Sequence, residues 1–187
     1  MGSPVCGRCG LPTAFATFLC EEYKNVDFGF ESARTPLRCE GVGEEIVRAL
    51  KYQGYKKVVG RLAAPLVLQV LGDGRFDAVV PVPLHRSRLR NRGFNRAELL
   101  VRDVAEEINA TVSDTLKVVR STRDQVELSA AQRRANVAGA YRASAPPRGK
   151  ILLIAAFTTG ATMSACATTL LRAGAQEVHA LSLCRTV

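Results

Sequence analysis

The sequence predicts an α/β fold with a mainly parallel sheet flanked by helices, preceded by a small, loop-rich region that contains cysteines. Two long apolar runs are typical of strands in such a sheet, at Phe76–Leu84 (FDAVVPVPL) and Ile151–Phe157 (ILLIAAF). From about residue 40 onward, the predicted strands and helices alternate along the chain. This alternation favours parallel strands, because each helix returns the chain to the starting edge of the sheet.

The first three helices are predicted from the spacing of apolar residues. These residues recur every three or four positions in 41–54, and again in the amphipathic segment 95–110. Asn95 is a suitable cap for the second of these segments. A more buried helix is expected at 61–71, where Pro65 is tolerated only near the first turn.

Local end signals place the remaining helices. Ser129 and Gln132 have the spacing of a capping box, which predicts a helix that begins at Ser129. Gly174 is expected to end a helix over Ala161–Ala173. Two further strands are predicted, at 114–120 and 177–184.

The chain has 187 residues, of which 26 are Lys or Arg and 17 are Asp or Glu, so its net charge is +9. This surplus suggests a polyanionic partner such as nucleic acid or a phosphorylated metabolite, and surface solubility explains it equally well. No apolar run approaches the ~20 residues that span a membrane. The N-terminus has no secretory pattern, so we expect a cytoplasmic protein with no membrane insertion.

Four of the six cysteines lie in the first 39 residues. In a cytoplasmic chain we expect reduced thiols that bind metal or are simply buried. Cys6 and Cys9 have a CxxC spacing that suits two ligands of a tetrahedral Zn²⁺ ion. With Cys20 and Cys39 they form a candidate structural zinc site, and free thiols are the alternative. We assign 1–38 to this cysteine-rich segment and the rest of the chain, 39–187, to the α/β domain.

The segment TTGAT follows the strand Ile151–Phe157 and opens the next helix. Ligands of open α/β sheets bind outside the carboxyl ends of strands. Gly160 permits a tight turn, and the helix start offers amides that suit an anion. Threonine hydroxyls add donors. The sequence therefore predicts a phosphate site at Thr158, Thr159, Gly160, Ala161 and Thr162, with an ordinary threonine-capped corner as the alternative.

Four stretches together resemble the ComF family of bacterial phosphoribosyltransferase-like proteins. They are LKYQG at 50–54, VVPVPLHRSRLRNRGFNRAELL at 79–100, TRDQVELSAAQRRANVAGAY at 122–141 and TTGATMSACATTLLRAGA at 158–175. Their order and spacing agree over about residues 36–187. The resemblance implies a type I phosphoribosyltransferase-like core, in which TTGAT holds the 5′-phosphate of phosphoribosyl pyrophosphate. It also implies an N-terminal zinc ribbon, which is degenerate here because Tyr23 replaces one cysteine.

The turn departs from the family pattern in one respect. The family has two adjacent acidic residues before the turn, which bind the ribose hydroxyls directly or with Mg²⁺, whereas this chain has Ala155 and Ala156 and looks one residue shorter. Losing two charged hydrogen bonds at ~1.5–3 kcal/mol each would weaken binding ~100-fold or more. Double substitution alone would not shorten the segment, so natural divergence is favoured over an engineered deletion.

A basic stretch follows the strand Phe76–Leu84 and is expected to be a loop at the same sheet edge. Arginine side chains match phosphate oxygens, often with two hydrogen bonds. By resemblance, this loop faces pyrophosphate, and nucleic-acid contact or a merely solvated loop are the alternatives. The candidate residues for pyrophosphate or polyanion binding are Lys51, His85, Arg86, Arg88, Arg90 and Arg92.

The resemblance also suggests a mobile segment that closes over the reaction centre, with Arg123 or Arg133 as candidate catalytic charge stabilisers. Ordinary surface charge explains these two residues equally well. Mg²⁺ would be needed with phosphoribosyl pyrophosphate if the protein is active.

Two functions follow from the resemblance. The first is a helper role in DNA uptake during natural transformation, with weakened or absent catalysis and with single-stranded DNA and DNA-uptake proteins as partners. The second is an active phosphoribosyltransferase of nucleotide metabolism that uses phosphoribosyl pyrophosphate. The missing acidic pair at Ala155 and Ala156 weighs against the second.

Overall fold

A computed structural model describes residues 4–21, 23–49, 65–66, 68–71, 74–123, 128–157 and 160–185. The helices are α1 (Val42–Ala49), α3 (Arg86–Arg92), α4 (Arg96–Glu107), α5 (Ala130–Val137) and α6 (Ala161–Arg172). Residues 65–66 and 68–71 are also helical. The strands are β1 (Ser32–Arg34), β2 (Leu37–Arg38), β3 (Ala78–Pro81), β4 (Thr111–Val112), β5 (Leu116–Val118), β6 (Tyr141–Ala143), β7 (Lys150–Phe157) and β8 (Glu177–Arg185).

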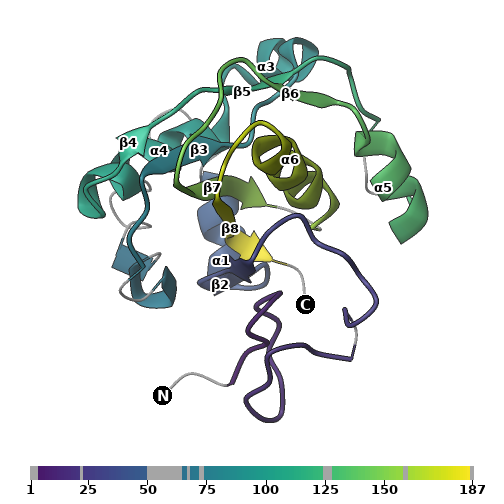
Figure 1. Ribbon diagram of the computed structural model, residues 1–187. Coiled ribbons are helices and arrows are strands. Elements are labelled where there is room, and N and C mark those ends of the chain that lie inside the picture. The colour runs from purple at the N-terminus through teal and green to yellow at the C-terminus, as the bar shows by residue number, and fades with distance from the viewer. Residues whose placement is uncertain are drawn as a thin grey trace.

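The main sheet confirms the predicted parallel arrangement. Its strand order is β1-β8-β7-β3-β4, and β2 also pairs with β8. All of these pairings are parallel. The central pair, β7 and β8, runs in register from Lys150 opposite Glu177 to Phe157 opposite Cys184. Helices lie over both faces of this sheet (Figure 1).

Strand β7 separates two hydrophobic layers. Ile151 and Leu153 belong to the cluster that contains α6 residues, whereas Leu152 and Ile154 belong to the cluster that contains α4 residues. All four side chains are at most 1% exposed. Because successive side chains of a strand point to opposite faces, a strand covered on both sides must be apolar at every position. This explains the uninterrupted run ILLI.

Two predicted helix starts are confirmed by their hydrogen bonds. The Asn95 side chain accepts from the Ala97 amide (3.0 Å) and donates to the Val82 carbonyl (3.0 Å), so it joins α4 to the chain after β3. At α5, Ser129 and Gln132 form both bonds of the predicted capping box. These bonds connect near neighbours in the sequence, which is why the sequence alone could locate them.

The strand predicted at 114–120 exists as β5, but it is outside the parallel sheet. It pairs antiparallel with β6, with Leu116 opposite Ala143, and forms a separate two-stranded ribbon (Figure 1). Thr115 fixes the ribbon by donating to the Ala145 carbonyl (2.6 Å). The partner strand β6 is only three residues long and follows α5 directly, so periodicity gave no signal for it.

The N-terminal region contributes to the sheet as well as to a loop. Strands β1 and β2 lie along β8, while the preceding residues form a compact group of loops at one side of the sheet (Figure 1). The parallel sheet therefore begins before residue 39. Among the described residues, no helix has both the length and the hydropathy that crossing a membrane requires.

Candidate functional site

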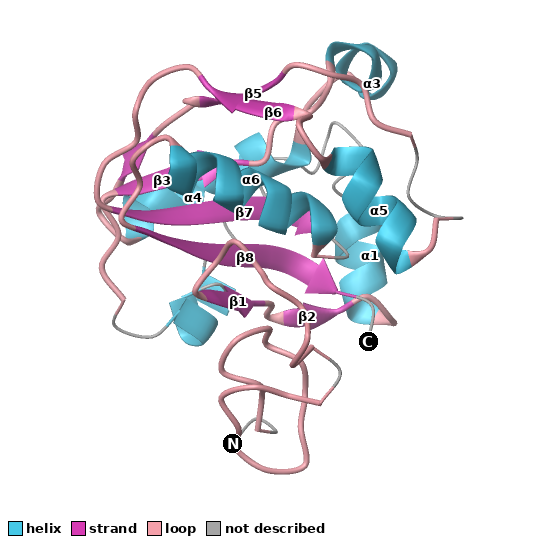
Figure 2. Ribbon diagram, turned by 45° about the vertical axis from the view of Figure 1, so that its right-hand side comes forward, coloured by secondary structure: helices cyan, strands magenta, loops and turns pink. Residues whose placement is uncertain are grey.

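The candidate site lies at the carboxyl edge of the parallel strands, where ligands bind in open α/β sheets. Strand β7 leads to α6 and strand β3 leads to α3, so both predicted anion-binding segments leave the sheet at this edge (Figure 2). The common edge follows from the parallel pairing of β3 with β7, in which Pro81 lies opposite Ile154.

The predicted phosphate turn is described from Gly160 onward, and Thr158 and Thr159 lie outside the described residues. Gly160 has φ of +90° and precedes the first helical residue, Ala161. A backbone in this region favours glycine, which agrees with the conformational freedom that we expected Gly160 to provide. Thr162 lies in the first turn of α6, where helix amides have no acceptor within the helix.

The two alanines before the turn lie within β7. Ala155 is 5% exposed and pairs in register with Ser182 of β8. The side chain of Ala156 is outside the described part of the structure. Strand β7 carries no carboxylate from Ile151 to Phe157. No acidic side chain at the end of this strand can therefore contact a bound ligand.

The basic stretch after β3 forms a helix, α3, where we expected a loop. The Nδ1 atom of His85 accepts from the Ser87 amide (3.3 Å), and Gly93 ends the helix with φ of +79°. Arginine itself favours helices. A cap before the stretch and a glycine after it were the local signals that the loop prediction overlooked.

The arginines of α3 face different surroundings. Arg86 and Arg90 are exposed, whereas Arg88 is half-buried and donates from Nη2 to the Thr122 carbonyl (2.8 Å). Arg88 therefore joins α3 to the segment that follows β5. The side chain of Arg92 and the whole of Lys51 lie outside the described residues.

Tyr141 connects the arginine helix with the phosphate turn. Burial raises the pKa of its phenol far above the usual value, and the nearby Cys166 thiol adds to the effect. The positive charge of Arg88 and a hydrogen bond with Thr162 act in the opposite direction on this pKa. Thr162 and Tyr141, from α6 and β6, are thus neighbours, and the charge of Arg88 reaches the same phenol.

The two candidate charge stabilisers lie on or beside α5. The Arg123 amide donates to Asn136 Oδ1 (2.9 Å), and Asn136 Nδ2 donates to the Arg123 carbonyl (3.0 Å). Asn136 thus fastens the chain at Arg123 to the end of α5, and the Arg123 side chain is exposed. Arg133 is half-buried in α5 itself.

Three cysteines of the N-terminal region form a compact cluster. The Sγ atoms of Cys6, Cys9 and Cys20 all lie within 4.8 Å of one another, and those of Cys9 and Cys20 are 3.5 Å apart. Sulfurs bound to one tetrahedral Zn²⁺ at about 2.3 Å would be about 3.8 Å apart. The three thiols therefore have a spacing suited to a zinc ion.

The environment of the cluster shifts the pKa values of the two CxxC thiols in opposite directions. Burial opposes ionisation of Cys6, but hydrogen bonds from the backbone around Cys9, Arg8 and Cys20 outweigh it and lower the pKa of Cys6 to about 7. Burial raises the pKa of Cys9 to about 12. Because metal ligands are thiolates, Cys6 is prepared to bind a cation near neutral pH.

Cys39 does not join this cluster. We expected it as a fourth zinc ligand and expected Cys184 as a reduced core side chain, but the structure joins Cys39 to Cys184 in a disulfide. The physical reason is the course of β2 beside β8, which brings the two Cα atoms to 5.3 Å, a separation that a disulfide can span. The pairing spans 145 positions, so the cysteine spacing could not reveal it.

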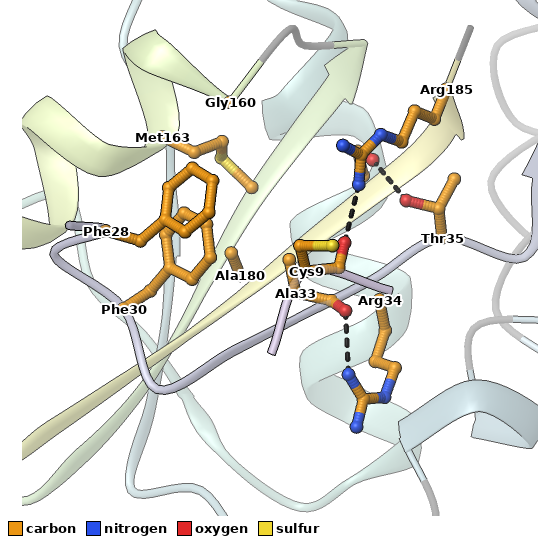
Figure 3. Close-up of a pocket in the computed structure, with 11 residues that line it drawn as sticks. Cys9, Phe28, Phe30, Ala33, Arg34, Thr35, Gly160, Met163, Ala180 and Arg185 are labelled. Atoms are coloured by element: carbon orange, nitrogen blue, oxygen red, sulfur yellow. Dashed lines mark hydrogen bonds between the residues drawn. The ribbon is translucent and has the colours of Figure 1, made fainter. Parts of the chain in front are cut away.

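A small cavity separates the cysteine cluster from the start of α6. Cys9, Phe28, Gly160, Met163 and Arg185 are among its lining residues (Figure 3). Its volume of about 20 Å³ has room for about one water molecule and excludes a nucleotide. The cavity is therefore a packing junction between the N-terminal region and the α/β domain.

Arg185 holds this junction together. Its guanidinium donates to the Cys9 carbonyl, as Figure 3 shows, and lies 5.4 Å from the centre of the Tyr23 ring. On the other side, the Gly29 amide donates to Ser164 Oγ of α6 (3.1 Å). The N-terminal region thus contacts both β8 and α6.

No family model matches the chain, whereas several known proteins are similar to it over nearly its whole length. The chain is 32% identical to the "DNA utilization protein YhgH" of Salmonella typhimurium over 192 residues, which cover 98% of the chain and 85% of that protein. The protein of the same name from Escherichia coli K12 is 29% identical with the same coverage. "Competence protein F" of Haemophilus influenzae is 28% identical over 194 residues, 97% of the chain and 85% of that protein.

Identity of 32% over nearly the whole chain establishes the relationship. The protein belongs to the ComF family, as the four stretches of resemblance predicted.

Replacing Arg185 by Ala is expected to loosen the N-terminal region from the sheet. The substitution removes a charged hydrogen bond to Cys9 and a contact with Tyr23, and such a bond contributes about 1.5–3 kcal/mol. Limited proteolysis with mass spectrometry should show cleavage within the first 38 residues several-fold faster than in the wild type. Arg102→Ala, at an exposed position on α4, is the control. Equal cleavage rates in the two variants would contradict this role of Arg185.

Proposed function

We propose that this protein takes part in DNA uptake and utilisation as a phosphate-binding member of its family, with weak or absent phosphoribosyl transfer. The observation that carries the proposal is the arrangement of the site: α3, with the exposed Arg86 and Arg90, and the start of α6 leave the sheet at one edge, whereas β7 carries no acidic residue before α6. The relatives named for DNA utilization and competence support the DNA-related part.

In this proposal, the first turn of α6 binds a phosphate group. The amides at a helix start favour an anion, and the hydroxyl of Thr162 adds a donor. Arg88 contributes positive charge from α3, and the exposed Arg86 and Arg90 attract a polyanion to the same edge. Each of these contacts is made to phosphate oxygens, so none requires the ribose of a nucleotide.

Mg²⁺ does not fit the end of β7 as this chain has it. The ion takes hard oxygen ligands, commonly carboxylates together with substrate phosphates. Ala155 offers no oxygen from its side chain and is packed against β8. The proposed function therefore includes no metal-assisted step.

We also propose that Cys6, Cys9 and Cys20 hold a structural zinc ion. Their spacing suits the ion, and their backbone is already folded into a knuckle in which the Cys6 amide donates to the Leu11 carbonyl (2.7 Å). Tetrahedral zinc takes four ligands. The fourth would be a water molecule or a ligand from outside the described cysteines, since Cys39 is paired with Cys184.

Single-stranded DNA binding should depend steeply on salt. Binding through phosphate contacts makes the affinity fall with salt, with a slope of about −0.7 for each contact in a plot of log affinity against log salt concentration. Fluorescence anisotropy with a labelled oligonucleotide across a salt series measures this slope. Absence of binding at low salt would overturn the DNA-related part of the proposal.

Phosphoribosyl pyrophosphate with Mg²⁺ should bind weakly, about 100-fold or more below a site with both carboxylates. The comparison is a variant with Ala155→Asp, Ala156→Asp and one added residue before Thr158, which should bind more tightly in calorimetric titration. A variant with asparagine in place of both aspartates tests whether the tighter binding requires their negative charge or only their side-chain shape. Micromolar binding by the wild type would instead favour an active transferase.

Protein purified without chelator should contain about one zinc per chain by elemental analysis. Cys9→Ser should lose this zinc, because it removes one of three sulfurs and leaves a smaller, harder oxygen. Cys166→Ala is the control, since Cys166 is a buried residue of α6 and is absent from the cluster. Zinc-free wild-type protein would contradict the zinc site.

A further inference from the structure

A second candidate binding site lies on the outer side of α6, away from the cysteine cluster. It is an open groove of about 550 Å³ between α6 on one side and α5 with β6 on the other. Figure 2 shows α5 beside α6 and the β5–β6 ribbon along the same side of the molecule. The groove begins at Ala161 in the first turn of α6 and extends to Arg172 in its last turn.

The charge of the groove has one sign among the described lining residues. Arg134 of α5, Arg142 of β6 and Arg172 of α6 all line it and are all exposed. No described residue of the lining is acidic, and within the described part of the chain no acidic side chain pairs with these three arginines. Three separate elements therefore direct planar, permanently charged groups to one groove.

The floor of the groove is made of small side chains, some of which carry hydroxyls. Ala165, Ser164 and Thr168 lie along α6, so a ligand can approach the helix closely. Ser164 Oγ accepts the hydrogen bond from the Gly29 amide, which leaves its own proton for an acceptor in the groove. The half-buried Tyr141 adds one aromatic ring to the lining.

We propose that this groove binds the sugar-phosphate backbone of single-stranded nucleic acid, and this inference rests on the proposed DNA-related function. Repeated phosphates complement three arginines from three elements and the hydroxyls between them. Helix α6 has 12 residues and is about 18 Å long, a length that accommodates a few nucleotides. With one aromatic ring available, the site binds strands without sequence preference.

The groove also connects with the phosphate turn, because Ala161 belongs to both. A strand along α6 would therefore end beside the first turn of the helix, which contains Thr162 and lies next to Tyr141 of the groove lining. The turn then receives a terminal or backbone phosphate of the same strand. This arrangement gives the turn a use that requires no ribose-binding carboxylates.

The test compares two variants with equal loss of charge. One carries Arg134→Gln, Arg142→Gln and Arg172→Gln in the groove, and the control carries three exposed arginines replaced elsewhere, Arg75→Gln, Arg102→Gln and Arg148→Gln. Glutamine keeps the helix preference of arginine, and circular dichroism with thermal unfolding verifies that both variants fold. Binding of a labelled oligonucleotide of about 20 nucleotides is measured across a salt series.

The groove variant should bind about tenfold or more weakly, with a salt slope lower by about two, whereas the control should stay within about twofold of the wild type. Equal weakening of both variants would overturn the groove and leave the DNA-related function standing, since binding would then follow net charge. Unchanged binding by the groove variant would also overturn the groove as the binding site. A wild type that binds no oligonucleotide at low salt would remove the proposed function itself.

Discussion

The parallel pairing of β7 with β8 is the contact on which the rest of the structure depends. It extends from Lys150 opposite Glu177 to Phe157 opposite Cys184, and both faces of the pair are buried. Helices α6 and α4 cover the two faces, and β1 and β2 add to the free side of β8. The pair thus fixes where α6 begins and where the N-terminal region attaches, which are the two features that define the candidate site.

Burial also explains why alanine is stable at a position where the resemblance to the ComF family predicts an acidic residue. Ala155 is 5% exposed and lies in a strand whose neighbours are apolar, so an alanine is stable there without any partner. An aspartate at the same position would need charged or hydrogen-bonding partners to offset its desolvation. The fold therefore does not depend on an acidic residue at Ala155, because apolar packing on both faces of β7 stabilises the strand.

Tyr141 and Arg185 each connect segments that are far apart in the sequence. Tyr141 forms a hydrogen bond with Thr162, is influenced by the charge of Arg88, and also forms part of the groove between α5 and α6. Arg185 links β8 to the cysteine cluster through the Cys9 carbonyl. Positive charge consequently surrounds α6 from its first turn to its last. This distribution is the basis for proposing a phosphate backbone as ligand, since a mononucleotide would occupy only the turn.

Features that depend on near neighbours could be predicted from the amino-acid order. Apolar runs indicated the parallel strands, and Asn95, Ser129 and Gly160 marked helix starts, because caps and turns are formed within a few residues. Contacts between distant residues became visible only in the folded protein. The separate β5–β6 ribbon, the Cys39–Cys184 pair and the arginine-lined groove each join segments many positions apart. Such contacts follow from how helices and strands pack on β7 and β8, and a one-dimensional pattern contains no measure of that distance.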